Sequence, residues 1–284
     1  MTGQFVGERE LLLSSVLEKL YREGGYDFRE YKTGTVNRRL ERRLHTLGVR
    51  DYAEYLRFLD ACPGEYEKLL DTLTIKVSGF LRSPIMFQQV ADRVLPAIIR
   101  AKRQGGEKEI RFWSAACARG EEPYSIAIML AEALGEEQHA FHITVHATDI
   151  CPRALADGEA AVYPAADLQN LAPGLVSRYF ERTERGYQVT GSIRRMVRFA
   201  RFDLTAPEPP PFRDIDCIFC CNVLIYWQRP LQERVLRRLT GTLADPGYLV
   251  LGEMESLPAG LQRTMRRADD AATIYRRITD DSPD

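Results

Sequence analysis

The sequence has almost no net charge and no long hydrophobic run. Among its 284 residues, 39 Lys and Arg stand against 40 Asp and Glu, so no global electrostatic field attracts nucleic acid. No uninterrupted apolar stretch is long enough to cross a bilayer, and Glu8 and Glu10 lie where a secretory signal needs positive charge. We therefore expect a soluble protein of the cytoplasm that neither enters the membrane nor binds nucleic acid.

Cysteine is also sparse, and the six cysteines form no metal-binding pattern. Cys217 and Cys220 have a C-x-x-C spacing, and Cys221 follows directly. All three lie in the apolar, strand-like run DIDCIFCCNVLIYW, and no second pair of Cys or His completes a tetrahedral set. We interpret them as reduced thiols in the core, with no metal site.

The first part of the chain, residues 1–84, reads as helices without convincing strands. Leu40, Leu44 and Leu47 recur with the helical period and predict one buried face. The same helix, in VNRRLERRL, carries a cluster of arginines: Arg38, Arg39, Arg42 and Arg43. An arginine-rich face is either a solvated surface or a docking surface for an acidic partner, and composition does not separate the two.

The rest of the chain, residues 85–284, alternates between strands and helices. The strand-like runs are EIRFWSA, HITVHAT, MVRFARF, DCIFCCNV and GYLVLGE, and helical stretches such as EEPYSIAIMLAEAL separate them. This alternation predicts an α/β fold with a mainly parallel sheet and helices on both faces. Between Tyr163 and Met196 the pattern changes to short strand candidates, which predict a small antiparallel insertion. The acidic C-terminus DDSPD is expected to be disordered.

The stretch FWSAACARGEEPYSIAIML, residues 112–130, contains the turn between the first strand and its helix. Open parallel sheets bind their ligands at such turns. Ala116 and Ala118 are small, and Gly120 can adopt positive φ, but the dinucleotide fingerprint G-x-G-x-x-G is absent. Glu121 and Glu122 would repel a phosphate at this helix N-terminus and favour a cationic or donor-rich ligand. The alternative is that both glutamates only complement the helix dipole.

Polar residues also follow the later strands. Asp149 ends the HITVHATD strand, where a carboxylate can accept both hydroxyls of a ribose. Asp203 and Asn222 follow two further strands, and Tyr226 comes one helical turn after Asn222. Together they outline a pocket for a nucleoside with an amino-acid-like arm. His142 and His146 share one face of a strand, and we interpret them as ordinary sheet residues.

Arg82, in TIKVSGFLRSP, is a candidate to bind the carboxylate of such a ligand, because a guanidinium pairs with a carboxylate through two parallel hydrogen bonds.

Taken in order, several blocks closely resemble the CheR-type chemotaxis receptor methyltransferases: TIKVSGFLRSPIMF, RFWSAACARGEEPYSIAIML, HATDICPRALADGEAAVYP, VRFARFDLTAPEPP, FCCNVLIYW and GYLVLGEMESL. The resemblance implies an N-terminal helical domain, residues 1–84, and a Rossmann-like domain, residues 85–284, with a β-subdomain at about 164–195. It also implies transfer of a methyl group from S-adenosyl-L-methionine to glutamates on the helices of methyl-accepting chemoreceptors. The product would be S-adenosyl-L-homocysteine.

The resemblance implies roles for particular residues. Arg82 and Tyr226 would lie at the reacting groups, Glu122 with Glu121 would face the methionine part of the cofactor, and Asp149 its ribose. The cofactor pocket as a whole would consist of Lys76, Ser78, Arg82, Ala116, Glu121, Glu122, Asp149, Asp203, Leu204, Cys221 and Asn222. The receptor-facing surface would consist of Arg38, Arg39, Arg42 and Arg43.

Several positions depart from the family pattern, among them Ser78 and Leu81 in the block that contains Arg82. Lys76 stands where the family has asparagine, Cys221 where it commonly has arginine, and Glu253 where it has histidine. These departures support a second hypothesis, a non-catalytic module that binds the cofactor or the receptor without turnover. A third hypothesis, a nicotinamide-dependent enzyme, is disfavoured by the missing glycine fingerprint and by the two acids at the turn.

Overall fold

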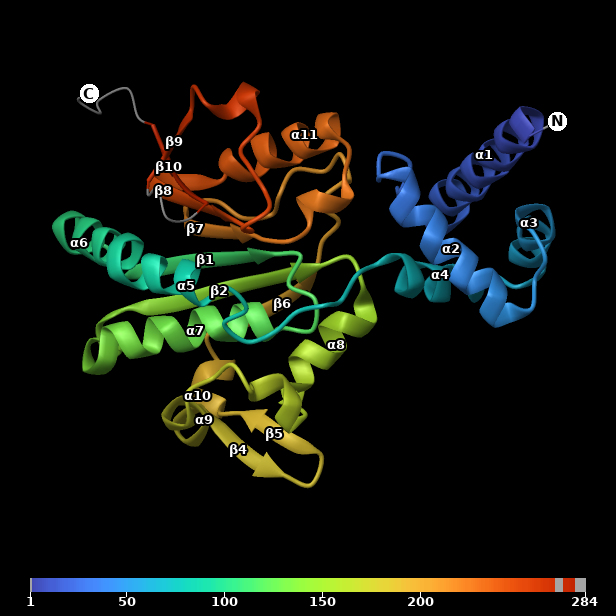
Figure 1. Ribbon diagram of the computed structural model, residues 1–284. Coiled ribbons are helices and arrows are strands. Elements are labelled where there is room, and N and C mark those ends of the chain that lie inside the picture. The colour runs from blue at the N-terminus through green and yellow to red at the C-terminus, as the bar shows by residue number, and fades with distance from the viewer. Residues whose placement is uncertain (1, 269–272, 279–284) are drawn as a thin grey trace. The chain divides into compact units, whose positions relative to one another are not determined.

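The computed structural model describes residues 2–268 and 273–278, so the acidic C-terminus DDSPD lies outside the described residues. The chain forms two compact units (Figure 1). The helical unit comprises the chain up to Ile75 together with Tyr226–Leu231, and the sheet unit comprises Lys76–Ile225 and the chain from Gln232 onward.

The helical unit is built as its hydrophobic pattern predicts. Its helices are α1 (Thr2–Lys19), α2 (Thr33–Leu47), α3 (Tyr52–Ala61) and α4 (Glu65–Leu73), and a π-helical turn, Leu20–Gly24, continues α1. Helix α2 buries Val36, Leu40 and Leu44, whereas Leu47 in its last turn is only half-buried. The helix ends at Gly48, whose φ of 69° is left-handed and suits glycine.

A short segment from late in the chain belongs to this helical unit. The backbone amide of Lys32 donates to the carbonyl of Tyr226 at 2.8 Å, and the amide of Gln228 donates to the carbonyl of Glu30 at 2.9 Å. The Trp227 side chain, between these two bonds, is buried. Tyr226–Leu231 is therefore anchored by main-chain pairing to residues about 200 positions earlier in the sequence.

The sheet unit contains the predicted, mainly parallel sheet. Its seven strands in the described residues have the order β6-β2-β1-β7-β8-β10-β9. Their bounds are β1 Glu109–Ala115, β2 His142–Asp149, β6 Val197–Arg201, β7 Ile215–Cys220, β8 Leu243–Leu251, β9 Met265–Arg267 and β10 Ile274–Arg277. The pairs from β6 to β8 are parallel, whereas β10 pairs with β8 and β9 antiparallel. The prediction of an α/β fold is confirmed.

Further helices follow along the chain, and several of them share a hydrophobic core with this sheet. They are α5 (Pro84–Gln89), α6 (Leu95–Gly105), α7 (Glu121–Leu134), α8 (Pro152–Ala160), α9 (Pro173–Tyr179), α10 (Gly191–Arg194) and α11 (Arg229–Thr240). Helices α6 and α7 lie in front of the strands in Figure 1 and share a buried apolar core with them. Strand β7, which contains Cys217 and Cys220, is buried throughout. Strand β1 lies between β2 and β7, so its carboxyl end is the position where sheets of this kind bind their ligands, called the crevice below.

The predicted antiparallel insertion is a small sheet of order β3-β5-β4. Its strands are β3 Val162–Tyr163, β4 Phe180–Thr183 and β5 Gly186–Val189. Residues 76–84, which the sequence predicts as the end of the first domain, lie in the sheet unit. The reason is Phe80, whose buried ring packs edge-on against Tyr163 at 4.9 Å and Phe180 at 5.2 Å between centroids.

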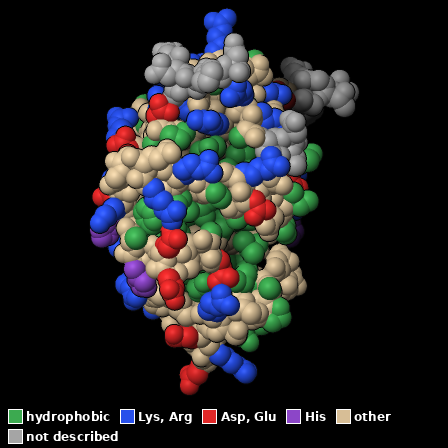
Figure 2. Space-filling view, turned by 90° about the vertical axis from the view of Figure 1, so that its left-hand side faces the viewer, with side chains coloured by type: hydrophobic (Ala, Val, Ile, Leu, Met, Phe, Trp, Pro, Cys, Tyr) green, Lys and Arg blue, Asp and Glu red, His purple; other side chains and the backbone are tan. Residues whose placement is uncertain are grey.

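Charges of both signs share the surface, as the balanced composition predicts. Figure 2 shows Lys and Arg side chains gathered on the upper half of one face, and acidic and basic side chains mixed below them. Among the described residues, no helix combines the length and the hydropathy that crossing a membrane requires.

Candidate active site

The turn after β1 has an unusual backbone. Ala116 and Ala118 have φ values of 72° and 48°, and Gly120 has 92°. A non-glycine residue in this left-handed region costs about 1–3 kcal/mol, and such residues concentrate at functional sites. The turn is held in place because the amides of Ala116 and Cys117 both donate to the carbonyl of Thr148, at 2.9 Å each. The backbone at the end of β1 is thereby fixed to the end of β2.

Gly120 is required at the end of this turn for a second reason. A Cβ atom there would lie 3.0 Å from both the Phe199 ring and the Tyr163 hydroxyl, and 3.1 Å from the Cα of Gly158. Any side chain would push α7 away from these neighbours. The glycine therefore fixes how closely the N-terminus of α7 approaches β3 and α8.

Asp149, at the end of β2, supports the turn through its carboxylate. Its Oδ2 accepts the amide of Ala118 at 2.9 Å, and its Oδ1 accepts the amide of Cys151 at 2.9 Å. Burial raises the pKa of Asp149, while these two amides and the charge of Lys76 act in the opposite direction. Each carboxylate oxygen has a second lone pair, so both can still accept a hydroxyl of a ligand.

The two adjacent glutamates point to different partners. Glu121 is fully buried and pairs with Arg119 at 2.7 Å. Glu122 is only partly buried, and its Oε1 accepts the Ser114 hydroxyl at 2.6 Å. Burial raises the pKa of Glu122 to about 7, against hydrogen bonds from Ser114 and Cys221 and the positive charge of Arg82. Of the two carboxylates, Glu122 is the one that lies beside Cys221 at the end of β7.

Residues 76–83 lie near the start of α7. The amide of Leu81 donates to the hydroxyl of Ser125 at 3.0 Å. Ser78 is half-buried, and Arg82 is exposed, with its Nη1 donating to the carbonyl of Val77 at 2.7 Å. The charge of Arg82 acts on Glu122 and that of Lys76 acts on Asp149. This segment therefore brings two cations to the two carboxylates of the site.

A buried acid that the sequence had not suggested as a site residue supports the end of β7. Glu255 accepts the amides of Asn222 and Gly252 at 2.8 Å each, and that of Ile225 at 3.3 Å. Asn222 itself has a left-handed φ of 60°. A Cβ at Gly252 would lie 2.7 Å from Nδ2 of Asn222, so these backbones approach closely. Glu255 thus fixes the residues just before Tyr226.

The loop after β6 forms a further wall. Oδ1 of Asp203 accepts the amide of Thr205 at 2.8 Å and its hydroxyl at 2.7 Å, which makes a local turn. Leu204 is buried, and Arg238 on α11 donates to the carbonyls of Leu204 and Ala206. The position of this loop therefore depends on a guanidinium that bonds to its backbone.

Not all the residues predicted for the site lie in one unit. The ends of β1, β2, β6 and β7 bring Ala116, Glu122, Asp149, Asp203, Leu204, Cys221 and Asn222 to one edge of the sheet. Tyr226 belongs to the helical unit, through its main-chain bond with Lys32.

The four arginines of α2 divide into two kinds. Arg43 forms a bidentate pair with buried Glu65, at 2.7 and 2.6 Å, and Glu65 also accepts the hydroxyl of Tyr55. Arg39 donates to the carbonyl of Thr72 at 2.8 Å. Arg38 and Arg42, in contrast, are exposed and one turn apart. Of the four arginines, this second pair is the one with exposed side chains.

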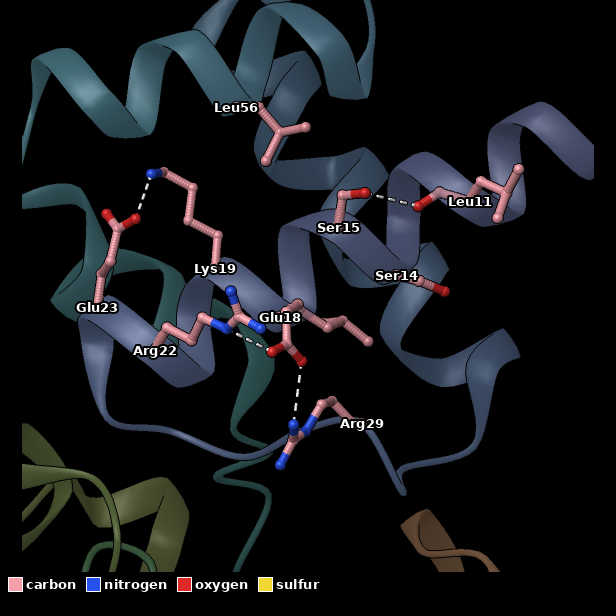
Figure 3. A pocket seen from close by; sticks show the side chains of 10 residues that line it. Leu11, Ser14, Ser15, Glu18, Lys19, Arg22, Glu23, Arg29 and Leu56 are labelled. Carbon is pink, nitrogen blue, oxygen red and sulfur yellow. Dashed lines mark hydrogen bonds and ion pairs between the residues drawn. The ribbon is translucent and has the colours of Figure 1, made fainter.

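The helical unit also contains a pocket of about 660 Å³ (Figure 3). Figure 3 shows Glu18 between Arg22 and Arg29, and Lys19 directed toward Glu23. These charged groups already pair with one another. The pocket lacks the convergent, unsatisfied polar groups of a ligand site.

Comparison with known proteins identifies the family. Residues 76–273 match the family described as CheR methyltransferase, SAM binding domain, and residues 12–74 match the CheR methyltransferase all-alpha domain. This chain belongs to the CheR methyltransferase family. It is 36% identical over 250 residues to the chemotaxis protein methyltransferase of Klebsiella aerogenes, covering 85% of this chain and 81% of that protein.

Two further relatives have similar identities. Chemotaxis protein methyltransferase 2 of Pseudomonas aeruginosa is 35% identical, with 85% of both chains covered. An uncharacterized 104.1 kDa protein of Rhodobacter capsulatus is 33% identical over 90% of this chain, which spans only 26% of that relative. The resemblance inferred from the motifs is confirmed, and so is the fold it implied. The chain is an S-adenosylmethionine-dependent methyltransferase, and the sheet unit binds the cofactor.

The residues at the crevice fit this cofactor. Asp149 offers free lone pairs to ribose hydroxyls, and Glu122 offers a negative charge to a ligand that carries an ammonium and a sulfonium. Neither carboxylate would suit a phosphate, because like charges repel.

Binding of S-adenosylmethionine should strengthen as the pH rises through about 7, because burial raises the pKa of Glu122 to about 7. Below that pH Glu122 is neutral and does not attract the cationic cofactor. If only the carboxylate form binds, the association constant falls about tenfold per pH unit below the pKa. Calorimetric titrations between pH 5.5 and 8.5 measure this slope, and Glu122→Gln should bind weakly with a flat profile. A sloping profile in Glu122→Gln would assign the titration to another group.

Proposed function

We propose that this enzyme transfers a methyl group from S-adenosylmethionine to glutamate side chains on the cytoplasmic helices of a chemoreceptor, in the cytoplasm. The observation that carries the proposal is the match to both CheR domains, together with Glu122 and Asp149 at the crevice of the sheet. The names of two relatives, both chemotaxis protein methyltransferases, support a chemoreceptor substrate.

The chemistry requires positioning more than acid–base catalysis. S-adenosylmethionine supplies a methyl group on a positively charged sulfur, a good leaving group. The substrate glutamate is already ionised at neutral pH, so its oxygen attacks the methyl carbon while the carbon–sulfur bond breaks and its electrons remain on sulfur. No proton moves. Alignment of this kind can lower the barrier by about 7–11 kcal/mol.

The protein's own residues would supply that alignment. In this proposal Asp149 holds the ribose hydroxyls, Glu122 faces the methionine arm, and Arg82 orients the cofactor's carboxylate near the transferred methyl. Lys76, Ser78, Glu121, Asp203, Leu204, Cys221 and Asn222 remain proposed pocket residues, and Tyr226 a proposed residue of the reacting centre. Glu121 would support the turn through its ion pair with Arg119, because its side chain is buried.

The direct test uses S-adenosylmethionine with a labelled methyl group and purified cytoplasmic fragments of chemoreceptors. Glutamyl methyl esters hydrolyse in base, so transfer to glutamate releases labelled methanol at high pH. Base-stable label would indicate a different acceptor. A fragment whose methylatable glutamates are changed to alanine is the matched control.

Arg38 and Arg42 should form the receptor-docking surface, because they are exposed and their charge complements an acidic helix. The double variant Arg38→Glu/Arg42→Glu should lose at least about tenfold in kcat/KM for the receptor fragment, while S-adenosylhomocysteine binds as in the unmodified enzyme. Arg57→Glu, an exposed arginine on α3, is the control for added negative charge. An equal loss in Arg57→Glu would exclude a specific role for the α2 face.

Arg43→Ala should act on stability instead, because Glu65 would be left buried without its cation. Removing one partner of such a pair costs about 3–5 kcal/mol. Chemical denaturation measures that loss in free energy of unfolding.

A non-catalytic module is the second candidate, and Lys76 is the observation that favours it. Its positive charge acts on Asp149, the proposed ribose acceptor. A module of this kind would bind the receptor fragment and release no labelled methanol with any receptor. Lys76→Asn, which restores the residue usual in the family, would then recover activity if the charge alone were responsible.

A further inference from the structure

Arg119 connects the cofactor turn to the small antiparallel sheet through its side chain. Its Nη2 donates to Oε1 of Glu121 at 2.7 Å and to Oδ2 of Asp167 at 2.9 Å. Glu121 lies at the start of α7, whereas Asp167 lies in the short helix Ala165–Leu168 that follows β3. One guanidinium therefore joins two carboxylates that are 46 residues apart in the sequence.

The backbone of Arg119 makes a second connection to the same part of the fold. The hydroxyl of Tyr163, on β3, donates to the carbonyl of Arg119 at 2.7 Å. The ring of Tyr163 also packs edge-on against Phe80, in the segment that carries Ser78 and Arg82. The beginning of the small sheet thus contacts both the cofactor turn and the Arg82 segment.

Because Glu121 is buried, its ion pair with Arg119 depends on how Asp167 holds the same guanidinium. Glu121 is fully buried, its Oε2 has no hydrogen-bond partner, and Arg119 is the cation paired with its other oxygen. Asp167 is 24% exposed and holds the same guanidinium from the other side. Without Asp167, the guanidinium of Arg119 loses one of its two anchors, and the bond from the Tyr163 hydroxyl to the Arg119 carbonyl is left as a contact between the small sheet and the turn.

We propose that Arg119 and Asp167 are positioning residues for the cofactor, because they hold turn 116–120 in the conformation that Asp149 requires. Ala118, next to Arg119, donates its amide to Oδ2 of Asp149. Displacement of the turn therefore reaches the proposed ribose acceptor through one hydrogen bond. Cofactor affinity then depends on the small sheet, although no residue of that sheet has to touch the cofactor.

The test is calorimetric binding of S-adenosylhomocysteine to Asp167→Ala. We expect Kd to rise about tenfold, within the usual range for coupled sites, while the melting temperature stays within about 2 °C and kcat at saturating cofactor within about twofold. Asp167→Asn keeps one acceptor for Arg119 and should recover part of the affinity. A double-mutant cycle with Arg119→Met should show non-additive losses, because both residues act through one contact.

The matched control is Glu132→Ala. Glu132, on α7, accepts the hydroxyl of Tyr179 and pairs with Arg178 of α9, away from the turn. The inference fails if Asp167→Ala binds S-adenosylhomocysteine within about twofold of the unmodified enzyme, or if Glu132→Ala weakens binding equally. It builds on the proposed assignment of the turn. Absence of binding in the unmodified protein would overturn that assignment, whereas equal binding in both proteins would overturn only the role of Asp167.

Discussion

Asp149→Ala should abolish measurable binding of S-adenosylhomocysteine, with Kd rising about a hundredfold or more. The carboxylate is expected to accept two ribose hydroxyls, and each hydrogen bond to a charged group contributes about 1.5–3 kcal/mol. The same carboxylate accepts the amides of Ala118 and Cys151, so its removal also frees the turn that approaches the cofactor. Calorimetric titration measures both effects together.

Two further variants separate these effects. Asp149→Asn keeps an oxygen for one of the two amides and should bind better than Asp149→Ala but still more weakly than the unmodified enzyme. Asp157→Ala removes an exposed acid from α8, the helix that follows, and should leave Kd unchanged. Normal binding by a folded Asp149→Ala protein would exclude the strand end as the ribose site.

Arg82→Ala should lower kcat by about 10²–10³-fold, the loss found when one preorganised donor is removed from a reacting centre. Arg82 is exposed and donates a hydrogen bond to the nearby carbonyl of Val77, so its loss should leave the fold intact. The rate of labelled methanol release at saturating cofactor and receptor fragment measures the effect. Binding of the receptor fragment should persist, because docking is assigned to Arg38 and Arg42.

Arg100→Ala serves as the control, since Arg100 is an exposed arginine on α6 with no proposed role in the site. Arg82→Lys keeps the charge without the planar guanidinium and should retain only part of the rate. Full activity in Arg82→Ala would remove this residue from the reacting centre.

Much of the site follows from periodicity and topology. Once the strand runs are recognised, Asp149, Asp203 and Asn222 must come near the carboxyl ends of their strands, and parallel strands bring those ends to one edge. The turn at 116–120 can also be predicted, because small residues and a glycine connect a strand with a helix. Helical spacing also separates Arg38 and Arg42 from the leucine face of α2.

What the sequence does not show depends on contacts between distant segments. Glu121 and Glu122 look equivalent in the sequence. In the fold, however, Glu121 is buried and pairs with Arg119, which Asp167 also binds. Helical spacing places Arg39 and Arg43 beside Arg38 and Arg42, but it does not show that a carbonyl and a buried acid beyond α2 bind the first two. No regular spacing in the sequence reveals such partners.

Glu255 and Tyr226 illustrate the same limit near the end of β7. Nothing in the sequence marks Glu255 as part of the site, yet in the fold its carboxylate accepts three amides from two separate segments. Tyr226 was expected one helical turn beyond Asn222, on the same rim. The sequence does not show that its carbonyl accepts the amide of Lys32, because that bond joins segments far apart in the chain.

The central claim is that the crevice at the end of β1 binds S-adenosylmethionine through Asp149 and Glu122. Calorimetric titration of the unmodified protein with S-adenosylhomocysteine tests it most directly, at pH 8, where Glu122 is ionised. We predict one bound molecule per chain with a micromolar Kd. Absence of detectable binding by the folded protein would contradict the claim and leave receptor docking through α2 as the remaining function.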